Sequence, residues 1–187
     1  GTSQYTDWGQ SVVVAASGQV YVGGTTFEEE SPGSGVFVPR MLTLSITPNG
    51  VTSWTRVFGL GFYSGNGTVS KIGLQPSWRV VIAGAKDVGQ DWVVAGYDPD
   101  GTLAWSGVWD ANSWFMSQPS DMAIDAAGNV CLCGDYGDTS VGLAAGVAKF
   151  GADGQLLWGR SLDPATEMNN VRGVGVDTAG NMYVTGL

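Results

Sequence analysis

Residues 99–105 read Pro-Asp-Gly-Thr-Leu-Ala-Trp, and the same order of tight turn, three intervening residues and tryptophan occurs twice more, ending at Trp54 and at Trp158. Intervals of 51 and 53 residues separate these two tryptophans from Trp105. A fixed period near fifty residues is typical of repeat architectures, in which each unit buries its apolar surface against its neighbours. We therefore expect one structural unit to recur along the chain.

A second motif repeats with the same period. A turn of small residues followed by an apolar strand that ends in glycine occurs at 16–23, 125–134 and 177–186. A degenerate copy at 74–84 keeps the strand but has no turn glycine. Each unit thus reads strand, tight turn, strand, variable loop, strand, tight turn, strand with tryptophan. Four strands per unit predict the blades of a β-propeller.

Residue preferences favour strands over helices throughout. Val, Ile, Tyr and Trp cluster in short runs bounded by Gly, Asp, Asn and Pro, as in strands joined by tight turns. No stretch has a sustained apolar period of 3.6 residues, so we predict almost no helix. The prediction is an all-β chain, one propeller segment over 1–187, with antiparallel four-stranded blades at about 8–58, 62–110 and 118–163 and a half blade at 168–187.

Three and a half blades do not close a ring, and residues 1–7 are too few to supply two missing strands. An open array leaves exposed strand edges, which invite pairing with another chain. We expect either a larger parent propeller or completion by assembly through these edges.

Composition excludes several classes of partner. The chain has 187 residues, 30 of them Gly, with 17 acidic against 8 basic residues and a net charge of −9. Nucleic acid and anionic membranes both require a basic surface, so we expect neither as a partner. No apolar run approaches the roughly 20 residues that span a bilayer. No basic-then-apolar signal segment opens the sequence, which is compatible with a mature start, a processed fragment or a cytosolic protein.

Cys131 and Cys133 lie two positions apart on one predicted strand, so their side chains project from the same face. Strand geometry places their Cα atoms about 6.5 Å apart with parallel Cβ vectors, which disfavours a disulfide between them. The chain has no histidine, so a metal site on these thiols would lack its usual further ligands. We expect two small buried hydrophobic residues and neither a metal nor a cofactor.

The stretches 148–158 and 170–186 resemble the bacterial β-propeller repeat called SBBP, and residues 62–108 look like the related delta-60 repeat through 71–76 and 95–101. The resemblance covers nearly the whole chain. It implies a propeller fold and a secreted or cell-surface bacterial or phage protein, and it brings no catalytic residue to carry over.

Function in such a fold concentrates in the loops between second and third strands and between consecutive blades. Aromatic rings beside carboxylates and amides are what a sugar requires, because the rings stack on CH groups while hydroxyls take hydrogen bonds. The candidate rim residues are Tyr63, Asp87, Asp91, Trp109, Asn112, Trp114, Phe115, Asp135, Tyr136 and Asp138.

Each candidate also has a structural interpretation. The tryptophans that end the strands, such as Trp54, are expected to pack between neighbouring units, and the rim aromatics divide between packing and ligand contact. The run Glu28 to Glu30 predicts a solvated loop, or a site for a cation or basic partner. Asp98-Pro99-Asp100-Gly101 faintly resembles a calcium loop but lacks the further ligands, which favours a plain turn.

Catalysis finds little support in the residues. Without histidine the chain cannot build a Ser-His-Asp triad. A carboxylate pair such as Asp135 with Asp138 would suit glycoside hydrolysis, but the sequence does not fix its spacing. The tryptophan-ending strand is similar to the repeat of quinone-dependent dehydrogenases, whose ligand-binding residues have no counterpart here.

The favoured hypothesis is a non-catalytic propeller module that binds a glycan or a protein, or serves as a structural assembly unit. The alternative is a fragment of a propeller enzyme, either a carboxylate-based glycosidase or lyase or a quinone-dependent dehydrogenase.

Overall fold

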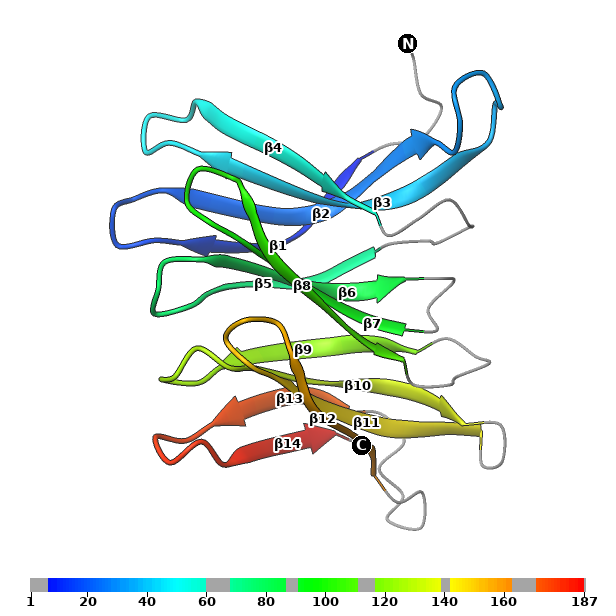
Figure 1. Ribbon diagram of the computed structural model, residues 1–187, viewed down its shortest axis with the longest axis vertical. Coiled ribbons are helices and arrows are strands. Elements are labelled where there is room, and N and C mark those ends of the chain that lie inside the picture. The colour runs from blue at the N-terminus through cyan, green and yellow to red at the C-terminus, as the bar shows by residue number, and fades with distance from the viewer. Residues whose placement is uncertain are drawn as a thin grey trace.

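A computed structural model describes residues 7–59, 68–86, 91–110, 117–138, 142–162 and 171–186. These residues form fourteen strands and, within these ranges, no helix, which confirms the predicted all-β class (Figure 1). The strands are β1 (Trp8–Val14), β2 (Val20–Glu29), β3 (Phe37–Ile46), β4 (Thr52–Phe58), β5 (Thr68–Leu74), β6 (Val80–Lys86), β7 (Asp91–Tyr97), β8 (Leu103–Asp110), β9 (Gln118–Ile124), β10 (Val130–Asp138), β11 (Gly142–Phe150), β12 (Leu156–Ser161), β13 (Val171–Val176) and β14 (Met182–Gly186).

Consecutive strands pair antiparallel into separate sheets. Sheet 1 contains β1–β4, sheet 2 β5–β8, sheet 3 β9–β12, and sheet 4 the pair β13–β14. The sheets follow one another along the long axis of the molecule, with sheet 1 at one end and sheet 4 at the other (Figure 1). Their first strands, β1, β5, β9 and β13, contact one another in that order. Sequence repeats that follow one another therefore become neighbours in space.

All the hairpin turns at one edge of the sheets share a single geometry. In each turn, the N–H of the first residue donates to the C=O of the fifth, and the N–H of the fourth residue donates to the C=O of the first. In the 98–102 turn these bonds run from Asp98 N to Thr102 O (2.9 Å) and from Gly101 N to Asp98 O (2.8 Å). The fourth residue has a positive φ, which glycine adopts without a steric penalty; six of the seven turns have glycine there, with φ between 80° and 87°. The seven five-residue turns are 15–19, 47–51, 75–79, 98–102, 125–129, 151–155 and 177–181.

The degenerate repeat keeps this turn without its glycine. Trp78 takes the fourth position with a φ of 68°, and it is the one non-glycine residue with positive φ in the described chain. The turn retains both hydrogen bonds, from Gln75 N to Arg79 O and from Trp78 N to Gln75 O, each 2.9 Å. The Gln75 side chain fastens it to sheet 3 by donating to the carbonyls of Gly128 (2.7 Å) and Ala152 (3.0 Å). These contacts offset the strain at Trp78.

The core lies in layers between the sheets. We call the face of each sheet that meets the following sheet its back face, and the face that meets the preceding sheet its front face. Directly paired residues share a face, as Ile72, Ile82 and Ala95 do on the front of sheet 2. The three layers include Tyr21, Met41, Trp54 and Phe58 against Ile72, Val80, Ile82 and Val93; Val81, Trp92 and Val94 against Val130, Leu132 and Phe150; and Cys133 and Val147 against Val174, Met182 and Val184.

Cys131 and Cys133 belong to the back face of sheet 3. Both are completely buried and neither forms a disulfide, as expected from their spacing. Burial desolvates the thiolate of Cys133 and, with the nearby Asp121 carboxylate, raises the pKa of that thiol to about 12. Both residues thus act as small hydrophobic side chains.

The repeated tryptophan locks neighbouring sheets together at the turn edge. Trp54 of sheet 1 lies on the 98–102 turn of sheet 2, where its Nε1 donates to Pro99 O at 2.9 Å. A Cβ on Gly101 would lie 2.8 Å from the ring, so only glycine fits beneath it. The Trp105 ring covers Gly154 of sheet 3 in the corresponding position, but its buried Nε1 has no hydrogen-bond partner among the described residues. This confirms the predicted packing role for these two tryptophans.

Trp158 repeats the arrangement without a described turn above it. Arg160 lies over its ring at 5.8 Å, as Arg56 lies over Trp54 at 5.7 Å. Arg56 also donates from Nε to Gly101 O at 2.7 Å. The Trp54 ring and the Arg56 guanidinium of sheet 1 therefore both contact the 98–102 turn of sheet 2.

Polar contacts add a second set of links between sheets. Asp121 on β9 pairs with Lys71 of sheet 2 at 3.2 Å and accepts a 3.0 Å hydrogen bond from the backbone N–H of Val174 in sheet 4. Within sheet 3, Asp125 pairs with Lys149 at 3.0 Å. Burial raises the pKa of Asp125, but its bonds to Asn129 and Lys149 outweigh that effect and hold the pKa below the usual value.

We expect Trp78→Gly to raise the free energy of unfolding by about 1 kcal/mol, because the left-handed backbone region costs a non-glycine residue about 1–2 kcal/mol and glycine also gains entropy when unfolded. Urea denaturation of the two proteins measures the difference. The control is Trp105→Ala, which removes an inter-sheet contact and should destabilise. A Trp78→Gly protein that is less stable than the parent would show that the exposed indole, 56% accessible, makes a stabilising contact.

Candidate functional site

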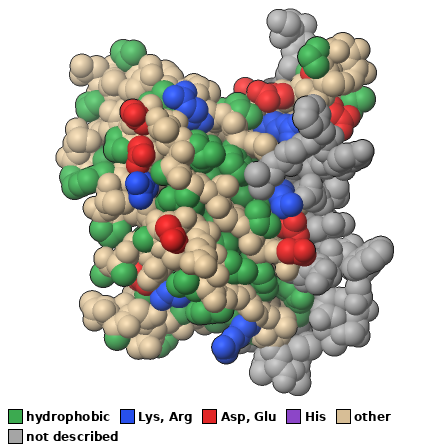
Figure 2. Space-filling view, viewed as in Figure 1, with side chains coloured by type: hydrophobic (Ala, Val, Ile, Leu, Met, Phe, Trp, Pro, Cys, Tyr) green, Lys and Arg blue, Asp and Glu red, His purple; other side chains and the backbone are tan. Residues whose placement is uncertain are grey.

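The sheets differ from one another at the edge opposite the five-residue turns. There the connections, read from the strand bounds, run from three residues (139–141) to nine (59–67 and 162–170). We call this the loop edge. On the face drawn in Figure 2, charged side chains lie on either side of a central region in which hydrophobic side chains gather. Loops carried on a regular scaffold are where binding residues concentrate, which makes this edge the candidate functional site.

The ten candidate rim residues separate into three groups. Tyr63, Asp87, Asn112, Trp114 and Phe115 lie outside the described residues. Asp138 is the last residue of β10, and its side chain is likewise outside the described part. The structure places the remaining four, Asp91, Trp109, Asp135 and Tyr136.

Trp109 and Tyr136 form part of the core between sheets 2 and 3. Trp109 is 8% exposed and stacks on Tyr136 with ring centroids 5.6 Å apart and an angle of 14°. Its edge meets Trp92 at 4.8 Å and 90°. Trp92 is fully buried and donates from Nε1 to Ser117 Oγ at 2.8 Å. This aromatic stack supports the loop edge from beneath.

Asp91, the first residue of β7, forms an ion pair within its hairpin. Its carboxylate pairs with Lys86 at 2.8 Å, directly across the β6–β7 register, and its side chain is 15% exposed. A carboxylate neutralised in this way stabilises the end of the hairpin. It does not serve as an open ligand for a partner.

Asp135 differs from Asp91 in having its charge poorly compensated. Burial desolvates its carboxylate and raises its pKa, and the positive charge of Arg172 opposes that effect only in part. Its backbone carbonyl accepts a 3.2 Å hydrogen bond from Ser117 Oγ, which fixes the strand at this point. Asp135 is therefore the described rim carboxylate whose pKa is raised by burial, which makes it a candidate for ligand contact.

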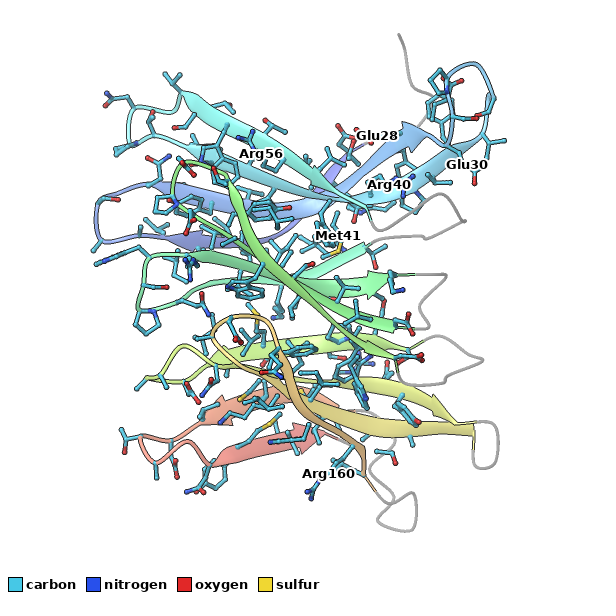
Figure 3. The ribbon with its side chains drawn as sticks, viewed as in Figure 1. Glu28, Glu30, Arg40, Met41, Arg56 and Arg160 are labelled. Carbon is cyan, nitrogen blue, oxygen red and sulfur yellow. The ribbon has the colours of Figure 1, made fainter. Side chains whose placement is uncertain are left out.

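The long β2–β3 hairpin belongs to the loop edge, and on it lie Glu28, Glu30 and Arg40 (Figure 3). The sequence analysis named the acidic run and missed Arg40. The sequence treated Glu28 to Glu30 as one acidic run, but the middle residue has a separate task. Glu29 accepts the N–H groups of Gly33 and Gly35 at 3.0 and 2.9 Å, which closes the hairpin loop and lowers the pKa of Glu29. The strand register sets Arg40 opposite Thr26, two positions from Glu28 and on the same face of the hairpin, a neighbour that spacing along the chain does not reveal.

Neither a metal cluster nor a membrane-spanning helix occurs in the part of the chain that the structure describes. In that part no three His, Cys, Asp or Glu side chains gather where they would hold a metal ion. No described helix has the length and apolar character to cross a bilayer.

We expect Asp135→Asn to raise the free energy of unfolding at pH 7, by less than about 1 kcal/mol because the group is partly solvated. The pKa of Asp135 is raised in the folded state, so its ionisation opposes folding once the pH exceeds that pKa. The gain from asparagine therefore grows as pH rises above the unfolded value near about 3.9 and is smallest below it.

Urea denaturation of Asp135→Asn between pH 3 and 7 checks this, with Asp91→Asn as the control. Asp91→Asn removes the carboxylate that pairs with Lys86 and should lower stability at pH 7. An equal loss of stability in both variants at pH 7 would contradict the account of Asp135.

Comparison with known proteins places the fold and leaves the function open. No family model matches the chain, and no curated protein matches it. Among solved structures, it is similar to a crystal structure of a protein of unknown function from Bacteroides caccae, with a TM-score of 0.57 at 15% sequence identity. The match covers 94% of this chain and 52% of that chain, so this chain spans about half the length of that structure. At this identity the likeness shows the fold alone.

Proposed function

We propose that the four sheets are blades of a β-propeller of the SBBP and delta-60 type, and that the chain is a non-catalytic binding module of a secreted or surface protein. Support for the blades comes from the consecutive strand order within each sheet and from the contact between successive first strands. The repeated packing of a strand-ending tryptophan on the next turn adds to this.

One observation carries the binding role, namely the contrast between the two edges. At the turn edge all seven connections have five residues and the same pair of hydrogen bonds. At the loop edge, connection lengths and residue types differ from sheet to sheet. A scaffold that is uniform on one edge and divergent on the other is how repeat proteins present recognition loops.

A glycan is the ligand that the loop-edge residue types fit best. The connecting segments contain Trp114 and Phe115 beside Asn112, a set that supplies ring faces for stacking and an amide for hydroxyl groups. With Trp109 and Tyr136 engaged in the core, Trp114 is the aromatic residue on which the proposal rests most directly.

A protein partner is the second candidate, favoured by the β2–β3 hairpin. Its strands have ten residues each, and its charged residues Glu28, Glu30 and Arg40 lie close together on the loop edge (Figure 3). Mixed charges of this kind suit a polar interface rim more than a sugar face.

Glycan-array screening followed by calorimetric titration of the best hit tests the proposal. We expect binding by the parent chain and a loss of at least about tenfold in affinity for Trp114→Ala, because stacking and desolvation by one ring contribute about 1–2 kcal/mol.

The matched control is Trp78→Gly, which removes an exposed tryptophan from the opposite edge and should leave the affinity unchanged. Equal effects of the two variants would place binding elsewhere. Hydrolytic turnover of any bound glycan would replace the binding role with a catalytic one.

A further inference from the structure

The turn that joins β3 to β4 contains the sequence Asn49-Gly50 at its third and fourth positions (Figure 1). Asn49 is exposed, and Gly50 has a φ of 80°. The third residues of the equivalent turns in sheets 2 and 3, Asp100 and Asp153, are also exposed, although indole rings cover the glycines that follow them. Exposure of the third side chain is therefore a property of the turn itself, whatever packs above its glycine.

The Asn49 side chain takes no part in holding its turn. In the equivalent turns, the carboxylates of Asp100 and Asp153 accept the backbone N–H two residues on, at 2.8 and 3.1 Å. In the 47–51 turn the corresponding N–H, that of Val51, donates instead to Thr47 Oγ1 at 3.1 Å. Within the described residues the Asn49 carboxamide forms no hydrogen bond, so it is free to turn toward the backbone beside it.

The other asparagines of the described chain, Asn129 and Asn181, are held in place. Each is the last residue of its turn and donates from Nδ2 to the carboxylate of the first, Asp125 or Asp177, at 2.8 Å. They are followed by valine and methionine, whose side chains crowd the backbone nitrogen that follows the asparagine. The glycine after Asn49 has no side chain and leaves that nitrogen open to approach.

We propose that Asn49 is a site of spontaneous deamidation, in which the backbone nitrogen of Gly50 attacks the side-chain carbon Cγ. The new N–Cγ bond closes a succinimide ring, and the Cγ–Nδ2 bond breaks, so that the amide group leaves as ammonia with the proton of the Gly50 N–H. Water then adds to one of the two ring carbonyl carbons and opens the ring, which gives aspartate or isoaspartate at position 49. Water is the one co-reactant, and nothing is oxidised or reduced.

The hydrogen bonds of the turn control the rate of this step. The Gly50 N–H donates to Thr47 O at 2.9 Å, so the nitrogen becomes a nucleophile only when the turn opens. Local opening takes less free energy at an exposed hairpin end than within a strand. Thr47→Ala removes the Oγ1 acceptor of Val51 N and favours the open turn. We expect it to speed deamidation about fivefold, the factor to which the loss of one hydrogen bond corresponds.

The two products differ in what they do to sheet 1. Aspartate reproduces the residue found at this position in the equivalent turns. Isoaspartate inserts a methylene group into the backbone of a turn whose length sets the pairing of Ser45 with Trp54. Because Trp54 donates to Pro99 O of sheet 2, a shift of β4 also disturbs the contact between the two sheets. Formation of isoaspartate should therefore destabilise the chain, and Asn49→Asp should not.

Tryptic mapping by mass spectrometry, after incubation of the folded chain at mildly alkaline pH, tests the proposal. Cleavage after Arg40 and Arg56 yields a peptide in which Asn49 is the one asparagine, and Asn66, which is also followed by glycine, falls in the next peptide. We expect succinimide and deamidated forms of peptide 41–56 to accumulate well before any change at Asn129 or Asn181. Labelling by an isoaspartyl methyltransferase then identifies isoaspartate in that peptide.

Asn49→Gln is the matched control, because its side chain is one methylene longer and closes the larger ring far more slowly. Urea denaturation compares aged parent, aged Asn49→Gln and fresh Asn49→Asp, and we expect the aged parent to be the least stable. Peptide 41–56 that stays unmodified, or that changes no faster than the peptides with Asn129 and Asn181, would overturn the proposal. The turn lies at the edge opposite the loop edge, so this result is independent of glycan binding there.

Discussion

The contact between a strand-ending tryptophan and the turn glycine of the next sheet is the constraint on which the rest of the structure depends. Trp54 covers Gly101, and Trp105 covers Gly154. In each turn the glycine meets two demands, a positive φ and the lack of a Cβ beneath an indole ring. Because sheets joined only by flat aliphatic faces could slide, this contact of an indole ring on a glycine fixes how sheet 2 sits on sheet 1 and how sheet 3 sits on sheet 2.

That constraint explains the unequal freedom of the two edges. The turn edge is held by fixed connection length, fixed hydrogen bonds and the indole contact, so its residues vary little in kind from one copy to another. The loop edge rests on strand ends supported from beneath by aromatic packing, such as Trp109 between Trp92 and Tyr136. Connections there are free to differ without disturbing the layers, which is the condition under which a recognition surface can diversify.

The layered core also accounts for the surfaces that the molecule leaves open. Within the described residues, each layer of the core is formed by the back face of one sheet and the front face of the next. On the front face of sheet 1, Val12 and Val14 are exposed, and on sheet 4 the exposed Tyr183 donates its hydroxyl to the Asp177 carboxylate at 3.0 Å.

The sequence by itself determined the repeat, the strand order within each unit, the all-β class, and the unbridged burial of Cys131 and Cys133. These follow from local rules, since turn glycines, alternation and the fifty-residue period act over short distances along the chain. It also anticipated the packing of Trp54 and Trp105, because a large ring repeated at one place in each unit is most easily buried between units.

Only the tertiary structure decided which loop-edge aromatic residues belong to the core and which loop-edge carboxylates form ion pairs. Trp109 and Tyr136 look like rim residues along the chain, and their stacking appears only when sheets 2 and 3 meet. Likewise Asp91 and Asp135 differ because Lys86 lies across one hairpin while burial and a distant Arg172 act on the other. Packing between sheets and the electrostatics of burial depend on neighbours far away in sequence, and periodicity carries no information about them.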